Sequence, residues 1–209
     1  MRVTKDSRAT RRREPSTEQG RRTRAAIVAA AGQLMYERGV AATSLDDVLN
    51  ACGAGKSQLY HYFGGKQELV AAVIDHQLRG ILANQPRLEH LQSWADFDGW
   101  AADLLALQAG PAGTAACPLG SLAGELDDDP DLHQELDAAF RTWESFLAGG
   151  LDRLRERGLL RADADPARLA AATMAALQGG LMLAHLRRDI TPLQDALTMA
   201  LAHLRSHRP

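Results

Sequence analysis

Two short helical patterns separated by glycines occupy residues 44–66, SLDDVLNACGAGKSQLYHYFGGK, and this stretch restricts the possible folds more than any other. In the first pattern, apolar side chains recur at i, i+3, i+4 and i+7, which is one face of a short helix. They are Leu45, Val48, Leu49 and Cys52. Leu59 and Phe63 would form the buried side of the second helix. Gly53 and Gly55 permit a steep turn between them, because glycine tolerates positive φ. With an apolar helical pattern just upstream, this spacing predicts a helix-turn-helix.

The string Gly55, Lys56, Ser57 also matches the end of a phosphate-binding loop of nucleotide-binding proteins, G-x-x-x-x-G-K-[ST]. That loop needs a glycine at position 50, where this chain has Asn50, and it must follow a buried strand. The preceding residues have helical periodicity instead. The sequence therefore disfavours a nucleotide site and favours a turn between two helices.

The rest of the chain also has helical periodicity, and no stretch alternates apolar and polar residues as a half-buried strand does. We expect helices at about 21–38, 45–52, 56–63, 66–84, 94–109, 130–157, 166–188 and 192–207, with a short one after Pro118. Ser44 and Asp47 form an S-x-x-D capping box that would begin the second helix. The predicted fold class is all-α.

Charge is unevenly distributed along the chain. Residues 1–24 contain nine Lys or Arg and three Asp or Glu, a charge of +6, so the remainder carries −8 because the whole chain carries −2. A basic arm on an acidic body suggests a polyanionic partner at one end. A disordered, solubilising tail explains the same charge equally well. We treat residues 1–20 as a flexible arm that either contacts DNA or only solubilises the chain.

Cysteine use and hydropathy indicate the compartment. The two cysteines, Cys52 and Cys117, have no metal-type spacing and suit a reducing cytosol. The charged N-terminal residues lack the apolar core of a secretory signal. Residues 169–186 are the most membrane-like run, but they include Thr173, Gln178 and His185, as a buried bundle helix can. We predict a cytoplasmic protein without a membrane segment, metal or cofactor.

The polar side chains of residues 56–62 suit DNA if they face outward. With the two apolar residues inside, the remaining ones lie outward or at the edge: Lys56, Ser57, Gln58, Tyr60, His61 and Tyr62. Lysine contacts guanine or phosphate, glutamine pairs with adenine in two places, and phenolic hydroxyls donate to phosphates. The alternative is a helix-turn-helix that serves only as a structural corner.

Residues 25–74 resemble the DNA-binding domain of the TetR family of transcriptional regulators. The resemblance rests on a first helix ending in ERG, on the ATS entry to the second, and above all on LYHYFGGKQELV. It implies a DNA-binding domain at 21–66 and a helical ligand-binding and dimerisation domain at 67–209. It also implies a homodimeric repressor that a ligand releases from a palindromic operator. The alternative function is a DNA-binding module that lacks a small-molecule sensor and acts through a protein partner.

The resemblance also suggests roles for individual residues. Thr43 and Ser44 match contacts to the phosphate backbone, and Lys66 matches a backbone contact at the start of the fourth helix. The base-reading positions match Lys56, Ser57 and Gln58, and Tyr60 and Tyr62 match contacts to phosphate or a thymine methyl. Two positions depart from the family. Leu45 stands where some members have a base-reading arginine, and Gly55 replaces a common Ser or Thr cap.

The stretch CPLGSLAGEL, which begins at Cys117, superficially resembles a hydrolase motif. Its order is G-S-x-x-G rather than the G-x-S-x-G of a nucleophile elbow, and no strand precedes it. We therefore predict no enzyme activity. The stretch resembles one in a TetR subgroup linked to multidrug-type regulation, which suggests a sensor role without assigning a ligand. The resemblance to the family as a whole implies a hydrophobic small molecule as the effector.

Aromatic residues in the second half would form either core or pocket walls. The candidate ligand-binding residues are Trp100, Cys117, His133, Phe140, Trp143 and Gln178. The last two predicted helices are apolar enough to supply a dimer surface, as the family resemblance implies, although they could equally pack inside one monomer. The expected partners are thus a double-stranded DNA operator, an effector and a second copy of the chain.

Overall fold

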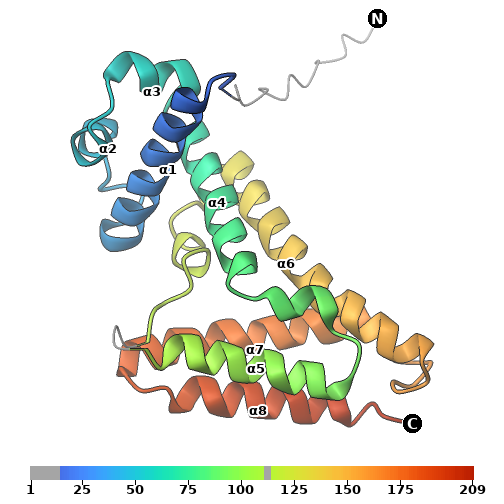
Figure 1. Cartoon of the computed structure of the whole chain (residues 1–209). Helices are drawn as coiled ribbons and strands as arrows, with labels where there is room; N and C mark the ends of the chain where they lie inside the picture. Colours follow the sequence, from blue (N-terminus) through green and yellow to red (C-terminus); the bar gives the residue numbers. More distant parts are fainter. Residues whose placement is uncertain (1–14, 111–113) are drawn as a thin grey trace, which may run out of the picture. The chain divides into compact units, whose positions relative to one another are not determined.

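The computed structural model describes residues 15–110 and 114–209, and within these ranges every regular element is a helix (Figure 1). The all-α prediction is therefore confirmed for the described part of the chain. The chain divides into two compact units, Met1–His76 and Gln77–Pro209, which we describe separately. The basic residues 1–14 lie outside the described ranges.

The first unit contains α1 (Glu18–Arg38), α2 (Leu45–Cys52), α3 (Lys56–Tyr62) and the first half of α4 (Lys66–Ala83). Both α2 and α3 pack against α1. Helix α1 begins three residues before its predicted start, because Thr17 caps it: the Thr17 hydroxyl accepts a hydrogen bond from the Gly20 amide at 3.1 Å. Residues 18–20, which we assigned to the flexible arm, thus belong to a helix.

The turns before α2 and α3 are stabilised differently. The predicted capping box of α2 is present, with the Asp47 amide donating to Ser44 Oγ at 3.1 Å and the Ser44 amide donating to Asp47 Oδ2 at 2.9 Å. Gly53 ends α2 in the left-handed region, at φ 69°, as expected. The same prediction was wrong for Gly55, whose φ of −76° is accessible to any residue.

The core of the first unit is apolar and drawn from all of its helices. Leu59 and Phe63 face inward as predicted, with exposed fractions of 0% and 2%. They lie in a core with the other buried apolar side chains of this unit, which include Ile27, Ala31, Met35, Val48 and Leu69. Each large buried side chain contributes about 1.5–3 kcal/mol to folding. This burial fixes which face of α3 remains outside.

The second unit continues α4 and adds four long helices with two short 3₁₀ turns. The long ones are α5 (Trp94–Gln108), α6 (Pro130–Glu156), α7 (Pro166–Arg187) and α8 (Thr191–Arg205). The short turns are Pro86–His90, which the sequence did not indicate, and Gly120–Leu122 (η2), the predicted short element after Pro118. Proline occupies the first turn of α6, α7 and α8, where its missing N–H costs nothing.

Helix α8 packs against both α5 and α7, and α7 also packs against α6 (Figure 1). Gly180 permits a close approach of α7 and α8, because a Cβ there would lie 3.0 Å from the Leu193 Cα. Among the described residues, α7 is the one helix long and apolar enough to cross a membrane. It is a packed helix of this unit, with Leu169, Leu177 and Ala184 fully or nearly fully buried.

Candidate DNA-binding surface and ligand pocket

The exposed face of α3 carries the polar side chains that the sequence placed there. Lys56, Ser57, Gln58 and His61 are exposed, and Tyr60 is 49% exposed despite its large apolar ring. Because Leu59 and Phe63 hold the opposite face in the core, these side chains form one continuous outer surface. We call Lys56, Ser57, Gln58, Tyr60 and His61 the α3 face.

Two residues of the α3 face are engaged by local partners. The Gly55 amide donates to Gln58 Oε1 at 2.9 Å, so Gln58 caps the start of α3 where glycine offers no side-chain cap. The amide protons of Gln58 Nε2 have no partner among the described residues. Lys56 Nζ lies 3.6 Å from Asp46 Oδ1, and both side chains are about two-thirds exposed or more. Such an exposed pair is worth about 1 kcal/mol or less, so Lys56 can exchange it for a phosphate.

Tyr62 differs from its neighbours because it packs against the start of α1. A Cβ on Gly20 would lie 3.2 Å from the Tyr62 hydroxyl and 2.7 Å from the Cβ of Pro15. Glycine at position 20 thus leaves room for both Pro15 and the Tyr62 hydroxyl beside the start of α1. Tyr62 is consequently half-buried, with its ring edge-on to His61 at 5.2 Å between centroids.

Thr43 does not lie on the surface, contrary to the expected phosphate contact. Its exposed fraction is 1%, its hydroxyl donates to the Gly39 carbonyl at 2.8 Å, and its amide donates to the Val40 carbonyl at 3.3 Å. Both of its donors are therefore used within the loop between α1 and α2. A threonine hydroxyl often satisfies itself on a nearby backbone carbonyl, and the sequence pattern does not distinguish that from exposure.

Ser44 and Lys66 lie near the helix starts that the sequence indicated. The Ser44 hydroxyl donates to Asp47 Oδ2, and these contacts lower the pKa of the Asp47 carboxyl from its ordinary value. Ser44 is exposed, but its hydroxyl and amide are both committed to this cap. Lys66 is half-buried and reaches back to the Ala41 carbonyl, with Nζ 3.4 Å from the oxygen.

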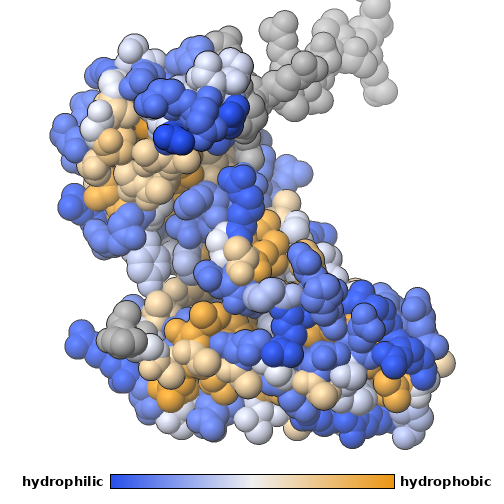
Figure 2. All heavy atoms as spheres, viewed as in Figure 1, coloured by the Kyte–Doolittle hydropathy of each residue, from blue (hydrophilic) through white to orange (hydrophobic). Residues whose placement is uncertain are grey.

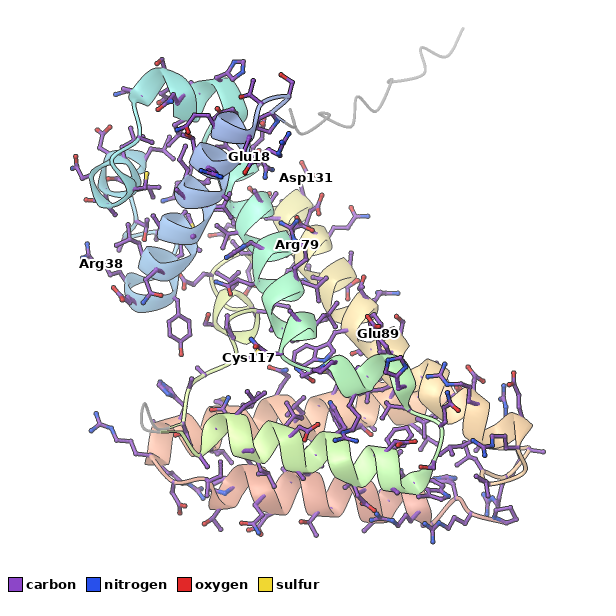
Figure 3. All side chains as sticks on the ribbon, in the orientation of Figure 1. Glu18, Arg38, Arg79, Glu89, Cys117 and Asp131 are labelled. Carbon is purple, nitrogen blue, oxygen red and sulfur yellow. The ribbon has the colours of Figure 1, made fainter. Side chains whose placement is uncertain are left out.

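The second unit contains a pocket of about 360 Å³. It unites three of the six predicted ligand-binding residues: Cys117, Phe140 and Gln178. Cys117 comes from the segment before η2 (Figure 3), and the other two come from α6 and α7. The remaining walls are Ala116, Gly120, Ser121, Ala123, Gly179, Met182 and His185.

The other three predicted residues do not line this pocket. Trp100 is buried and donates from Nε1 to Gln85 Oε1 at 3.0 Å, which makes it a satisfied core residue. Trp143 is also buried and stacks on Phe140, with ring centroids 6.4 Å apart. His133 is exposed and lies 3.8 Å from Asp127 Oδ1. The helical spacing of these residues predicts that they face inward, but it does not distinguish a side chain in the packed core from one that lines a cavity.

The pocket has an uncharged lining. None of its lining residues is Lys, Arg, Asp or Glu. Burial raises the pKa of the Cys117 thiol, and nearby amides of Gly120 and Leu119 and the Gln178 side chain offset only part of that effect. Cys117 therefore stays a protonated thiol at neutral pH. No group of three or more potential metal ligands occurs among the described residues.

Two family profiles match the chain. Residues 27–73 match that of bacterial regulatory proteins of the tetR family, and residues 99–200 match that of the tetracycline repressor-like C-terminal domain. A helix-turn-helix transcriptional regulator from the lacX 3′ region of Lactococcus lactis subsp. lactis is 33% identical over 185 residues, spanning 84% of this chain and 89% of that protein.

The chain belongs to the TetR family of transcriptional regulators. This TetR-family regulator is also similar to a helix-turn-helix regulator of Mycobacterium tuberculosis, at 30% identity over 191 residues that cover 84% of this chain and 89% of the relative. Its fold matches a TetR regulator of Chloroflexus aurantiacus with a TM-score of 0.76 at 25% identity, covering 92% and 98% of the two chains. It is thus a DNA-binding transcriptional regulator rather than an enzyme.

Sequence reasoning missed seven of the ten pocket residues of this TetR-family regulator, and Met182 and His185 are two of them. Both follow Gln178 at i+4 and i+7, so all three share one face of α7. That spacing was available in the sequence, but the apolar character of the whole helix concealed it. The His185 ring contacts the Thr114 carbonyl through Nδ1 at 2.9 Å, which ties the segment before Cys117 to α7.

Proposed function

We propose that this regulator is a cytoplasmic homodimeric repressor whose two α3 helices read a palindromic operator. The observation that carries the proposal is the α3 face, a polar surface backed by the buried Leu59 and Phe63. Such a helix fits the major groove, and two copies related by a two-fold axis contact half-sites about 34–36 Å apart.

Within the α3 face, Lys56, Ser57 and Gln58 are the proposed base-reading residues. A bidentate contact from glutamine to adenine discriminates by about 1–3 kcal/mol. Gln58 must release the Gly55 amide to use both ends of its carboxamide, which costs about 0.5–1.5 kcal/mol for one hydrogen bond. The cost offsets part of the gain, so we expect the net preference from Gln58 to lie toward the lower end of that range. If Gln58 instead keeps its hydrogen bond with the Gly55 amide, its Nε2 can still donate to an acceptor on a base.

The proposed phosphate contacts are Ser44, Tyr60, Tyr62 and Lys66, with His61 at the edge of the α3 face. Lys66 and Tyr60 have the greatest freedom for such contacts. Lys66 is held only by a long contact of 3.4 Å to the Ala41 carbonyl, and the Tyr60 ring is half-exposed and can turn toward DNA. We leave Thr43 out of this set because, unlike the exposed Ser44, it is buried and cannot reach a phosphate. Loss of a phosphate contact would weaken binding to all sequences alike and reduce the salt dependence.

A dimer through α7 and α8 would cover apolar side chains that these two helices leave in solvent. Met182, Leu186 and Met199 are 61%, 75% and 64% exposed. On the face of the second unit seen in Figure 2, apolar residues also remain visible among hydrophilic ones. Exposed apolar patches of this kind mark association surfaces.

The proposed effector is a small hydrophobic molecule that binds the 360 Å³ pocket, whose lining includes Cys117, Phe140 and Gln178. The existence of this pocket favours a small-molecule sensor over a module that responds only to a protein partner. Helix α4 runs from Lys66, in the first unit, to Ala83, in the second. An effector that binds better to a state with another α3 separation would release the operator.

The function is tested with purified full-length protein and the DNA on either side of its own gene. We expect the protein to protect two half-sites about one helical turn apart. We also expect it to sediment as a dimer. A monomer, or binding without any sequence preference, would contradict it. The effector model is tested separately, by measuring operator affinity with and without a molecule that binds the pocket.

A further inference from the structure

We infer that the pocket of the second unit selects an uncharged effector that carries a carbonyl or hydroxyl oxygen, and that Gln178 holds this oxygen. This inference rests on the proposed function of the pocket, and it adds the chemical class of the molecule. The volume of about 360 Å³ lies at the lower end of the range for small-molecule pockets, about 300–1,000 Å³.

The lack of Lys, Arg, Asp and Glu in the lining disfavours ionic ligands. A carboxylate or ammonium group in this pocket would meet no opposite charge, because its ten lining residues include no Lys, Arg, Asp or Glu. The neutral thiol of Cys117 does not supply one either. Burying an ion without a partner is far more costly than burying a neutral polar group that is hydrogen-bonded.

Gln178 is the polar group best able to hold a neutral ligand. Its Nε2 donates to Met174 Sδ at 3.6 Å, and a thioether sulfur is a weak acceptor. An oxygen atom of a ligand is a better acceptor, so the exchange favours binding. Ser121 is less suitable because its hydroxyl already donates to the Pro118 carbonyl at 2.9 Å.

Gly120 allows the Gln178 carboxamide to lie over η2. A Cβ at position 120 would lie 2.9 Å from Gln178 Oε1 and 3.2 Å from the Cys117 Cβ. A side chain there would displace the carboxamide. Gly120 is thus a positioning residue for Gln178. This role gives a structural reason for one glycine of the CPLGSLAGEL stretch, which the comparison with the hydrolase motif left unexplained.

His185 supplies a second polar group at the rim. The Thr114 carbonyl can only accept, so Nδ1 of His185 donates to it, and Nε2 is the ring atom left to accept from a ligand. Gln178 and His185 lie two turns apart on α7, so a ligand that meets both must present an acceptor and a donor at separate ends. A hydroxyl or an amide N–H meets the rim acceptor.

The inference is tested by calorimetry on the DNA-free, full-length protein with four matched probes. These are 2-naphthalenemethanol, 2-naphthoate, 2-naphthylmethylammonium and 2-ethylnaphthalene, which share a ring system and differ in charge and polarity. We expect the alcohol to bind at least tenfold more tightly than either ion, and several-fold more tightly than the hydrocarbon. Because the readout is direct binding, failure of operator recognition would leave this result unaffected.

Three variants identify the group responsible. Gln178→Leu should reduce the affinity for the alcohol to that for the hydrocarbon, and Gly120→Ala should weaken the alcohol more than the hydrocarbon. Gln178→Glu should make the ammonium probe the tighter of the two ions. Equal or tighter binding of an ion by the unmodified protein, an unchanged preference in Gln178→Leu, or no binding of any probe would overturn the inference.

Discussion

In the first unit the candidate DNA-contacting side chains stand on an exposed helix face and are engaged by weak local partners, such as the Asp46 contact of Lys56. In the second unit the candidate ligand-contacting side chains come from the segment around η2, from α6 and from α7, where Gly120 fits closely against Gln178. The difference teaches that one site lies on a single helix face backed by a core, whereas the other is assembled where separate elements pack together. Substitutions on the α3 face should therefore alter binding with little effect on stability, whereas those around the pocket affect both.

Among the variants that test this difference between the units, Leu59→Ala should have the largest effect on stability. Leu59 is fully buried beneath the α3 face, and its truncation should destabilise the first unit by about 2–5 kcal/mol. Urea denaturation measures the change, and operator binding should be lost with it. Ser57→Ala, on the exposed side of the same helix, is the control and should unfold like the unmodified protein. Equal stability of the two variants would contradict a core that supports α3.

The corresponding test in the second unit is Gly150→Ala. A Cβ there would lie 2.6 Å from the Leu91 Cβ and 3.1 Å from the Phe97 Cζ, so overpacking should cost about 1–3 kcal/mol. Gly149→Ala is a matched control, because the nearest atom to its Cβ is the flexible end of Arg153 at 3.5 Å. The control should be neutral or stabilised by up to about 1 kcal/mol, from helix propensity. A Gly150→Ala protein as stable as the control would contradict the packing described.

A pair of buried threonines compares the units directly. Thr43 donates to the Gly39 carbonyl and Thr173 to the Leu169 carbonyl, each at 2.8 Å and each four residues back. Thr→Val at either position should cost about 0.5–1.5 kcal/mol in thermal unfolding and leave operator affinity unchanged. If Thr43→Val weakened operator binding much more than Thr173→Val, Thr43 would be a DNA contact after all.

The smallest expected effect is the pH dependence of two helix starts that have a serine N-cap and an aspartate three residues later, one in each unit. Hydrogen bonds with Ser44 lower the pKa of Asp47, and hydrogen bonds with Ser93 and the Gln92 amide lower that of Asp96. A lowered pKa in the folded state means that each carboxylate stabilises the protein above pH 3.8. That contribution is lost as the pH falls through the folded-state pKa. Between pH 6 and 3, the free energy of unfolding should fall less in Asp47→Asn and Asp96→Asn than in the unmodified protein.

Most helix limits could be predicted from the sequence because they depend on local chemistry. Apolar periodicity, the capping box of Ser44 and Asp47, and first-turn prolines such as Pro130 and Pro166 act within a few residues of chain. The early start of α1 was missed because Thr17 lies in a stretch whose composition suggested disorder.

The site was predictable where it follows from periodicity and not where it depends on tertiary packing. The outward face of α3 follows from the inward positions of Leu59 and Phe63. The burial of Thr43 and the separation of Trp143 from the pocket depend on how the surrounding residues pack, which apolar periodicity does not specify. The capping role of Gln58 was detectable, since a polar N3 residue often caps a helix that begins after glycine.

The central claim, that the α3 face reads base sequence, is tested most directly by Gln58→Ala against a library of operator variants. Gln33→Ala is the control, because Gln33 is another exposed glutamine of the first unit and is hydrogen-bonded to Glu37 on α1. We predict that Gln58→Ala loses about 1–3 kcal/mol of preference at one base pair in each half-site, while Gln33→Ala loses none. A uniform loss of affinity across all sequences, or identical profiles for the two variants, would contradict the claim.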